Sequence, residues 1–144
     1  MSIIVKTIQD QQEMNEAFAI RRNVFIEEQQ VPEDLEIDEW EDIATHFLAL
    51  EEGKPVGTCR LRWVNPQTVK AERVAVLGEK RKTGAGKKLM EALELYARDK
   101  GAKTIVLNAQ IQVVPFYEKL GYRGTGASFF EAGIKHIPMK KELN

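Results

Sequence analysis

Hydrophobic positions recur along the chain with two spacings, one typical of strands and one typical of helices. Residues 3–6 predict a short strand, and a helix is expected to begin after Asp10 and to run to about Glu28. Asp10 and Glu13 have the spacing of a capping box at the start of this helix. The stripe of this helix that faces the protein comprises Met14, Ala17, Phe18, Arg21, Val24 and Phe25.

The rest of the chain continues in the same manner. The predicted strands are 46–52, 55–64, 69–77, 103–109, 122–126 and 136–140, with a hairpin turn at 53–55. The predicted helices are 84–100, which Gly101 ends, and a short one within 114–122, which Gly121 ends. Pro138 indicates that the last strand lies at a sheet edge. This order of elements predicts a mixed α/β layer fold.

Composition narrows the classes of function. The chain has 144 residues and a formal net charge of -1, so it lacks the basic excess that nucleic-acid binding requires. No apolar run approaches the roughly 20 residues that cross a bilayer, and the first residues do not resemble a signal peptide. Cys59 is the only cysteine, and with two scattered histidines it matches no zinc spacing. We expect one cytoplasmic domain spanning 1–144, with no metal, nucleic-acid or membrane partner.

The stretch RKTGAGKKLM (81–90) has two nearby glycines at the start of a predicted helix. A P-loop needs a glycine where Arg81 stands, and a dinucleotide fingerprint needs one where Leu89 stands. The pattern [QR]-x-x-G-x-[GA] is filled by Arg81, Gly84 and Gly86.

This glycine turn has the chemistry of an anion site. Glycine lets the backbone approach a ligand closely, and the first N–H groups of a helix have no partner within the helix. Together with the helix dipole these groups bind anions, and Lys82 and Lys87 add positive charge. The alternative is an ordinary strand-to-helix turn with solvated lysines.

Two motifs carry a resemblance to a known family. AERVAVLGEKRKTGAGKKLMEAL, followed by IVLNAQIQVVPFYEKLGYR, resembles the core of the GNAT superfamily of acetyl-CoA-dependent N-acetyltransferases. RRNVFIEEQQVPEDLEIDEWEDIATH and FFEAGIKHIPM resemble a branch of small, stand-alone bacterial members. The resemblance implies a largely antiparallel, twisted central sheet of six to seven strands with splayed central strands and helices on both faces. Thr83 is a departure, because many members have arginine there.

The resemblance also implies acetyl-CoA as co-substrate and a set of residues that bind it. The strand at 74–76 would pair its backbone with the pantetheine arm, and the amides of 82–87 would hold the pyrophosphate. The residues implied are Val74, Ala75, Val76, Arg81, Lys82, Thr83, Gly84, Ala85, Gly86, Lys87, Asn108, Phe116 and Tyr117.

Tyr117 is the predicted acid that protonates the departing thiolate, because the family has tyrosine at this position of the motif. Phe116 and Leu120 share one helical face, and Tyr117 is turned about 100° from Phe116, so it is free to point away from the core. The alternative is a tyrosine that only packs.

Glu72 is the first candidate for the base. Strand alternation would put it on one face with Val74 and Val76, and a carboxylate among valines would have a raised pKa. The alternatives are solvent exposure or a salt bridge with Arg60, Arg62 or Arg73. The reserve candidates are Glu28, Asp38 and His46, although His46 and His136 are more often structural in such positions.

The segment 27–42 contains nine carboxylates and no lysine or arginine. It is either a solvated loop or an acidic border that attracts a cationic amine. On the second interpretation Glu28, Asp38 and Trp40 contact the acceptor, while Trp40 is otherwise a local anchor.

A ping-pong reaction would need Cys59 as nucleophile, but alternation groups it with Leu61 as a buried apolar residue. We therefore expect direct transfer of acetyl to a primary amine of a small molecule or peptide. The alternatives are an acetyl-CoA-binding sensor without turnover and transfer of a longer acyl group. The sequence does not distinguish a monomer from a homodimer.

Overall fold

The computed structural model describes residues 2–143. Its strands are β1 (Ile3–Thr7), β2 (Thr45–Glu51), β3 (Lys54–Asn65), β4 (Thr68–Val76), β5 (Thr104–Gln110), β6 (Arg123–Gly124), β7 (Phe129–Glu131) and β8 (Ile134–Glu142). Its helices are α1 (Gln11–Arg21), the π-helical segment η1 (Arg22–Glu28), α2 (Glu33–Glu36), α3 (Ala85–Asp99) and α4 (Val114–Lys119), with 3-10 turns η2 (Gly78–Lys80) and η3 (Ile111–Val113). No helix in this range is long and apolar enough to cross a membrane.

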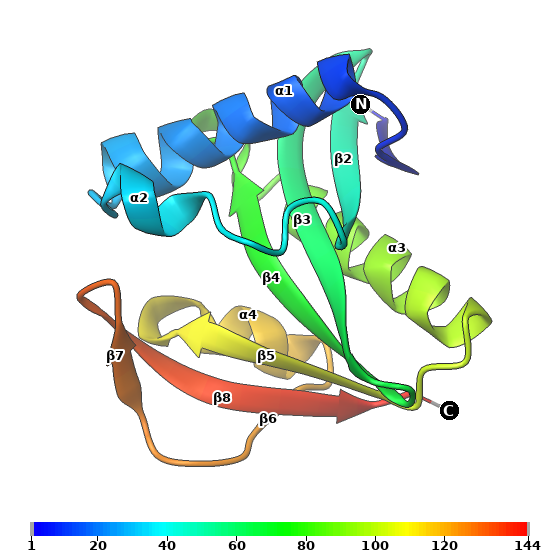
Figure 1. Cartoon of the computed structure of the whole chain (residues 1–144), viewed down its shortest axis with the longest axis vertical. Coiled ribbons are helices and arrows are strands. Elements are labelled where there is room, and N and C mark those ends of the chain that lie inside the picture. The colour runs from blue at the N-terminus through cyan, green and yellow to red at the C-terminus, as the bar shows by residue number, and fades with distance from the viewer. Residues whose placement is uncertain (1, 144) are drawn as a thin grey trace.

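The strands form one twisted sheet in the order β1-β2-β3-β4-β5-β8-β6, and β7 also pairs with β8 (Figure 1). Only β4 and β5 are parallel, and the other neighbours are antiparallel. The predicted mixed, largely antiparallel sheet is confirmed. It has eight strands, because the chain at 129–131 adds a short hairpin strand that the sequence pattern did not reveal.

Helices cover both faces of the sheet, as predicted. On one face, α1 buries Ala17 and Ile20 against Leu48 of β2. On the other, α3 buries Leu93 in a cluster that includes Phe47. Neighbouring strand residues such as Phe47 and Leu48 face opposite sides of a sheet, so each helix has its own apolar surface to cover.

The first helix begins as expected and changes its winding near its end. The Asp10 carboxylate accepts a hydrogen bond from the Glu13 N–H at 2.8 Å, which confirms the cap. From Arg22 to Glu28 the helix continues in π-helical form, a winding that is frequent at functional sites. A hydrophobic stripe does not distinguish the two windings, so the sequence predicted only a longer helix.

The prediction that Pro138 marks a sheet edge is wrong. Its strand, β8, lies between β5 and β6, and Pro138 faces Asn108 of β5. The Pro138 carbonyl accepts a hydrogen bond from the Thr125 N–H, on the side away from β5. The missing N–H of proline points to that same side, where β6 is only two residues long, so little pairing is lost.

Candidate functional site

The two central strands separate along their length (Figure 1). Their pairing ends at Lys70 of β4 and Val106 of β5. Beyond that point, 71–76 and 107–110 make no strand pairing with each other in the described chain. Their facing backbone groups are therefore available to an extended ligand that adds between them. The predicted splayed central strands are confirmed.

A bulge interrupts β4 beside this opening. Arg73 and Val74 together lie opposite the single residue Cys59 of β3, and Arg73 has a φ of 53°, which is uncommon for a residue other than glycine. Because of the extra residue, the Glu72 and Arg73 side chains both lie on the sheet face that α1 and α2 cover. The Val74 side chain lies on the opposite face, which α3 covers. The predicted sharing of one face by Glu72, Val74 and Val76 is wrong for this reason.

The glycine turn precedes α3 and leaves the helix N-terminus uncovered. Gly84 is the N-cap with a φ of 92°, and no side chain within the described chain caps the helix. The first bond of the helix runs from the Lys88 N–H to the Gly84 carbonyl, so the preceding N–H groups are free to bind an anion. A Cβ at Gly86 would lie 3.3 Å from the Phe116 ring, which explains the second glycine.

Arg81 leaves the turn and contacts the end of η1. Its guanidinium binds both carboxylate oxygens of Glu28, at 3.0 and 2.8 Å, and donates to the Val76 carbonyl at 3.1 Å. Lys82 and Lys87 are exposed. The positive charge of the turn is thus divided between a bound arginine and two solvated lysines.

The predicted donor-binding residues outside α4 lie on the same two strands and turn. Thr83 is exposed, and its hydroxyl donates to the Lys80 carbonyl at 2.5 Å. Ala85 is buried where α3 begins, and Ala75 is buried against the α1 side. Asn108 is half-buried on β5, past the last residue that pairs with β4.

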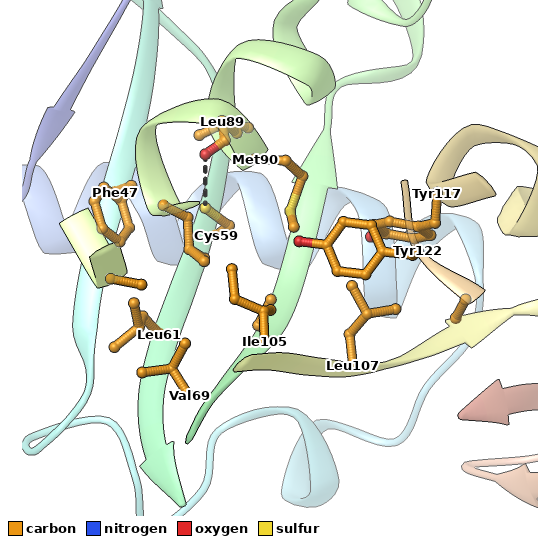
Figure 2. Packing of buried hydrophobic residues seen from close by; sticks show 14 of the residues in the cluster. Phe47, Cys59, Leu61, Val69, Leu89, Met90, Ile105, Leu107, Tyr117 and Tyr122 are labelled. Atoms are coloured by element: carbon orange, nitrogen blue, oxygen red, sulfur yellow. Dashed lines mark hydrogen bonds between the residues drawn. The ribbon is translucent and has the colours of Figure 1, made fainter. Parts of the chain in front are cut away.

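Tyr117 points into the main core, contrary to the prediction that it is free to point away (Figure 2). Its ring meets Phe116 and Tyr122 edge-on, with centroids 5.0 and 5.7 Å apart. The short helix α4 rests on the sheet through this ring, while Phe116 is only half-buried. Burial, assisted by Cys59 nearby, raises the pKa of Tyr117, so the phenol is protonated at neutral pH but is a weaker acid than a solvated tyrosine, and an acid role depends on its positioning.

Cys59 is a buried packing residue, as expected. Its thiol lies under α3, 4.0 Å from the Leu89 carbonyl (Figure 2). Burial raises the pKa of the Cys59 thiol, so the nucleophilic thiolate is disfavoured.

Both histidines are bound to main-chain carbonyls. The His46 ring lies 2.9 Å from the Glu41 carbonyl, and the His136 ring lies 2.7 Å from that of Ile134. Burial lowers the pKa of His46, which keeps its ring neutral near pH 7. These contacts support the structural interpretation of the two residues.

Glu72 is held by positive charges. Its carboxylate lies 3.1 Å from Arg60, 3.1 Å from Arg62 and 3.6 Å from Lys70. Burial alone would raise the pKa of Glu72, but the hydrogen bond from Arg62 and the charges around it prevail and lower the pKa. The prediction of a raised pKa is therefore wrong, and a base role for Glu72 loses its premise.

Glu72→Gln is expected to lower the free energy of unfolding by about 2 kcal/mol, because it removes charged hydrogen bonds from a half-buried site. The pH dependence of turnover near neutrality should not change. Urea denaturation and a pH–rate profile check the two expectations. A shifted profile would restore Glu72 as the base.

The acidic segment is largely neutralised by arginines from outside it. Five of its nine carboxylates form such ion pairs, namely Glu28–Arg81, Glu33–Arg22, Glu36–Arg21, Asp38–Arg60 and Glu41–Arg21. Asp38 binds Arg60 through two hydrogen bonds of 2.8 and 2.7 Å and also contacts Arg73. The predicted acidic border is thus mainly a set of structural ion pairs.

Trp40 is anchored within this set. The Arg62 guanidinium lies over its ring, 4.3 Å from the centroid, and its backbone N–H donates to Asp38 at 3.0 Å. These contacts favour the interpretation as a local anchor.

Arg60 lies at the centre of the ion pairs and is only 1% exposed. Arg60→Ala would leave Asp38, Glu41 and Glu72 without their shared partner, so we expect unfolding to become easier by about 3–5 kcal/mol. Arg62→Ala is the matched control, because Arg62 is more exposed and contacts only Glu72 among these carboxylates. Equal losses in urea denaturation would contradict the central role of Arg60.

These ion pairs also predict acid sensitivity. The pKa values of Asp38, Glu41 and Glu72 lie below their ordinary values of 3.8, 4.5 and 4.5, since arginine contacts outweigh the opposing effect of burial. The folded state therefore keeps these groups ionised to lower pH than the unfolded chain does. The stabilisation is complete above the ordinary values and is lost as the pH falls through the folded ones. Urea denaturation at pH values from about 6 to 3 should show that the free energy of unfolding falls with pH, and that this fall is shallower in Arg60→Ala.

Gln29 and Gln110 are site residues that were not expected from the sequence. The Gln110 amide donates to the Gln29 side chain at 2.9 Å, which joins the residue after η1 to the end of β5. The two residues are 81 positions apart, so no local pattern relates them.

Comparisons with known proteins agree with this geometry. A family model described as an acetyltransferase (GNAT) domain matches residues 4–143. The uncharacterized N-acetyltransferase YjcF of Bacillus subtilis (strain 168) is 42% identical over 134 residues, which cover 92% of this chain and 95% of the relative.

Solved structures have the same fold. A Lactobacillus plantarum protein, provisionally named an N-acetyltransferase, superposes with a TM-score of 0.92 at 26% identity, over 100% of both chains. A GNAT family acetyltransferase from Elizabethkingia anophelis, solved with acetyl-CoA bound, gives a TM-score of 0.79 at 18% identity, over 98% of both chains. The second likeness is one of fold alone.

Proposed function

This chain belongs to the GNAT acetyltransferase family and is therefore an acyltransferase, and we propose that it moves acetyl from acetyl-CoA to a primary amine. The acceptor is a small molecule or a peptide, and one domain spanning 1–144 carries the activity. The observation that carries the proposal is the opening between β4 and β5, which lies next to an uncapped helix N-terminus.

Both parts of this site suit acetyl-CoA. The unpaired edge at 71–76 supports binding of the pantetheine arm, which has the amide groups to pair with a strand. The left-handed Gly84 and the free N–H groups that follow it support binding of the pyrophosphate. The Elizabethkingia anophelis protein of the same fold was solved with acetyl-CoA bound, which supports acetyl-CoA as the donor in this proposal.

Two steps of the reaction fall to residues of this chain. A backbone N–H at the Val74 bulge polarises the thioester carbonyl in the manner of an oxyanion hole. The acceptor amine attacks in its neutral form, after its ammonium has released a proton to the solvent; the new C–N bond forms and the C–S bond breaks. Tyr117 gives its proton to the departing thiolate, and the proton that the new amide nitrogen loses restores the Tyr117 hydroxyl.

We propose direct transfer within a ternary complex. A covalent acyl-enzyme would need a reactive thiol, but Cys59 is buried beneath α3 and burial raises its pKa. The amine therefore attacks the thioester itself.

A thiol-release assay tests the function. Acetyl-CoA is offered with a panel of amines, amino acids, polyamines and peptides, and free CoA is measured. We expect release that depends on at least one primary amine. If CoA binds but no amine in the panel causes release of free CoA, the protein is an acetyl-CoA sensor. If a longer acyl-CoA turns over faster than acetyl-CoA, the longer acyl-CoA is the donor.

A further inference from the structure

The end of η1 spans both sides of the strand opening. Its last residue, Glu28, binds Arg81 in the turn that follows β4. The next residue, Gln29, hydrogen-bonds to Gln110 at the end of β5. Two consecutive residues of the acidic segment therefore contact the ends of the two strands that diverge.

Arg81 occupies groups that the donor would also use. The Leu77 N–H bonds to Val56 of β3, so the Val76 carbonyl in the same trans peptide unit points the other way, into the opening. That carbonyl accepts a hydrogen bond from Arg81 at 3.1 Å. Arg81 is thus attached to the strand edge, to the phosphate-binding turn and to Glu28.

Among the ion pairs of Glu28, Asp38 and Glu41, that of Glu28 is best able to exchange. The partners of Asp38 and Glu41 include Arg60, which is buried and shared, whereas the Arg81 and Glu28 side chains are 44% and 38% exposed. Exposed pairs contribute little stability, and guanidinium binds phosphate groups with two parallel hydrogen bonds. A diphosphate is therefore able to compete with Glu28 for Arg81.

We propose that Arg81 passes from Glu28 to the diphosphate of the donor, and that the released Glu28 carboxylate binds the ammonium of the acceptor. This inference rests on the proposed function. Binding of acetyl-CoA thus frees the Glu28 carboxylate, whose negative charge binds the acceptor ammonium. The donor therefore binds before the acceptor. Glu28 acts as a positioning residue for the acceptor, and Arg81 couples the two binding events.

Calorimetric titration with CoA tests the exchange. In Glu28→Gln the arginine is already released, so we expect CoA to bind about two- to fivefold more tightly than to the natural protein. Glu27→Gln is the matched control, since Glu27 precedes Glu28 on η1 and has no cationic partner within salt-bridge distance in residues 2–143. Arg81→Gln should weaken CoA binding and remove any further effect of Glu28→Gln.

Binding of n-butylamine provides the second readout. Its affinity for the natural protein should rise severalfold when CoA is present, and this rise should vanish in Glu28→Gln. Unchanged or weaker CoA binding by Glu28→Gln would overturn the exchange while leaving the proposed function intact. If the natural protein binds no CoA at all, the proposed function itself fails.

Discussion

Tyr117→Phe is expected to lower turnover about a hundredfold, the usual contribution of a positioned acid, with CoA affinity unchanged. The substitution removes the hydroxyl that protonates the thiolate. The ring, which packs edge-on against Phe116 and Tyr122, remains in place. Steady-state rates and CoA titration measure the two effects separately.

Tyr122→Phe is the control for this substitution. Tyr122 is the neighbouring buried tyrosine, and its hydroxyl donates to Glu94 at 2.8 Å. Its loss should cost about 1–2 kcal/mol of stability and leave turnover nearly unchanged. If Tyr117→Phe keeps the natural rate, the thiolate receives its proton from another group.

Gly84→Val is expected to weaken CoA binding by about ten- to a hundredfold, the effect of misaligning one or two charged hydrogen bonds. At a φ of 92° a β-branched residue is strained, although the space around Gly84 is open. The turn must then change its backbone, and the N–H groups at the start of α3 no longer converge on the pyrophosphate. CoA titration measures the loss.

Gly101→Val separates this effect from general strain. Gly101 follows the other end of α3, with a φ of 95° and equally open surroundings. Both variants should lose about 1–2 kcal/mol of stability, but only Gly84→Val should lose CoA affinity. Similar CoA affinities in the two variants would show that the turn at Gly84 has only a structural role.

The parts of this molecule that were predictable are those that short-range chemistry determines. Asp10 caps a helix because its carboxylate reaches an N–H three residues away. Gly84 was identifiable from the glycine pattern at the start of a predicted helix, and its φ of 92° is a conformation that glycine favours. The burial of Cys59 followed from strand alternation, which holds on β3 at that point.

The remaining features depend on contacts between distant parts of the chain. The bulge at Arg73 changes the faces of β4, and no local signal marks it, so Glu72 was expected among valines. Its partners Arg60 and Arg62 come from another strand, and Arg60 also pairs with Asp38 of the acidic segment. The acidic run contains no basic residues, so the positive charges that pair with its carboxylates must come from elsewhere. Only the fold reveals which arginines supply these charges.

The binding of the donor by this site is the central claim, and a crystal structure of the protein with CoA tests it most directly. We expect the pyrophosphate to lie within hydrogen-bond distance of the amides of 82–87, with the pantetheine chain between β4 and β5. A structure in which CoA binds elsewhere, or in which β4 and β5 pair along their full length beside the bound molecule, would contradict this claim.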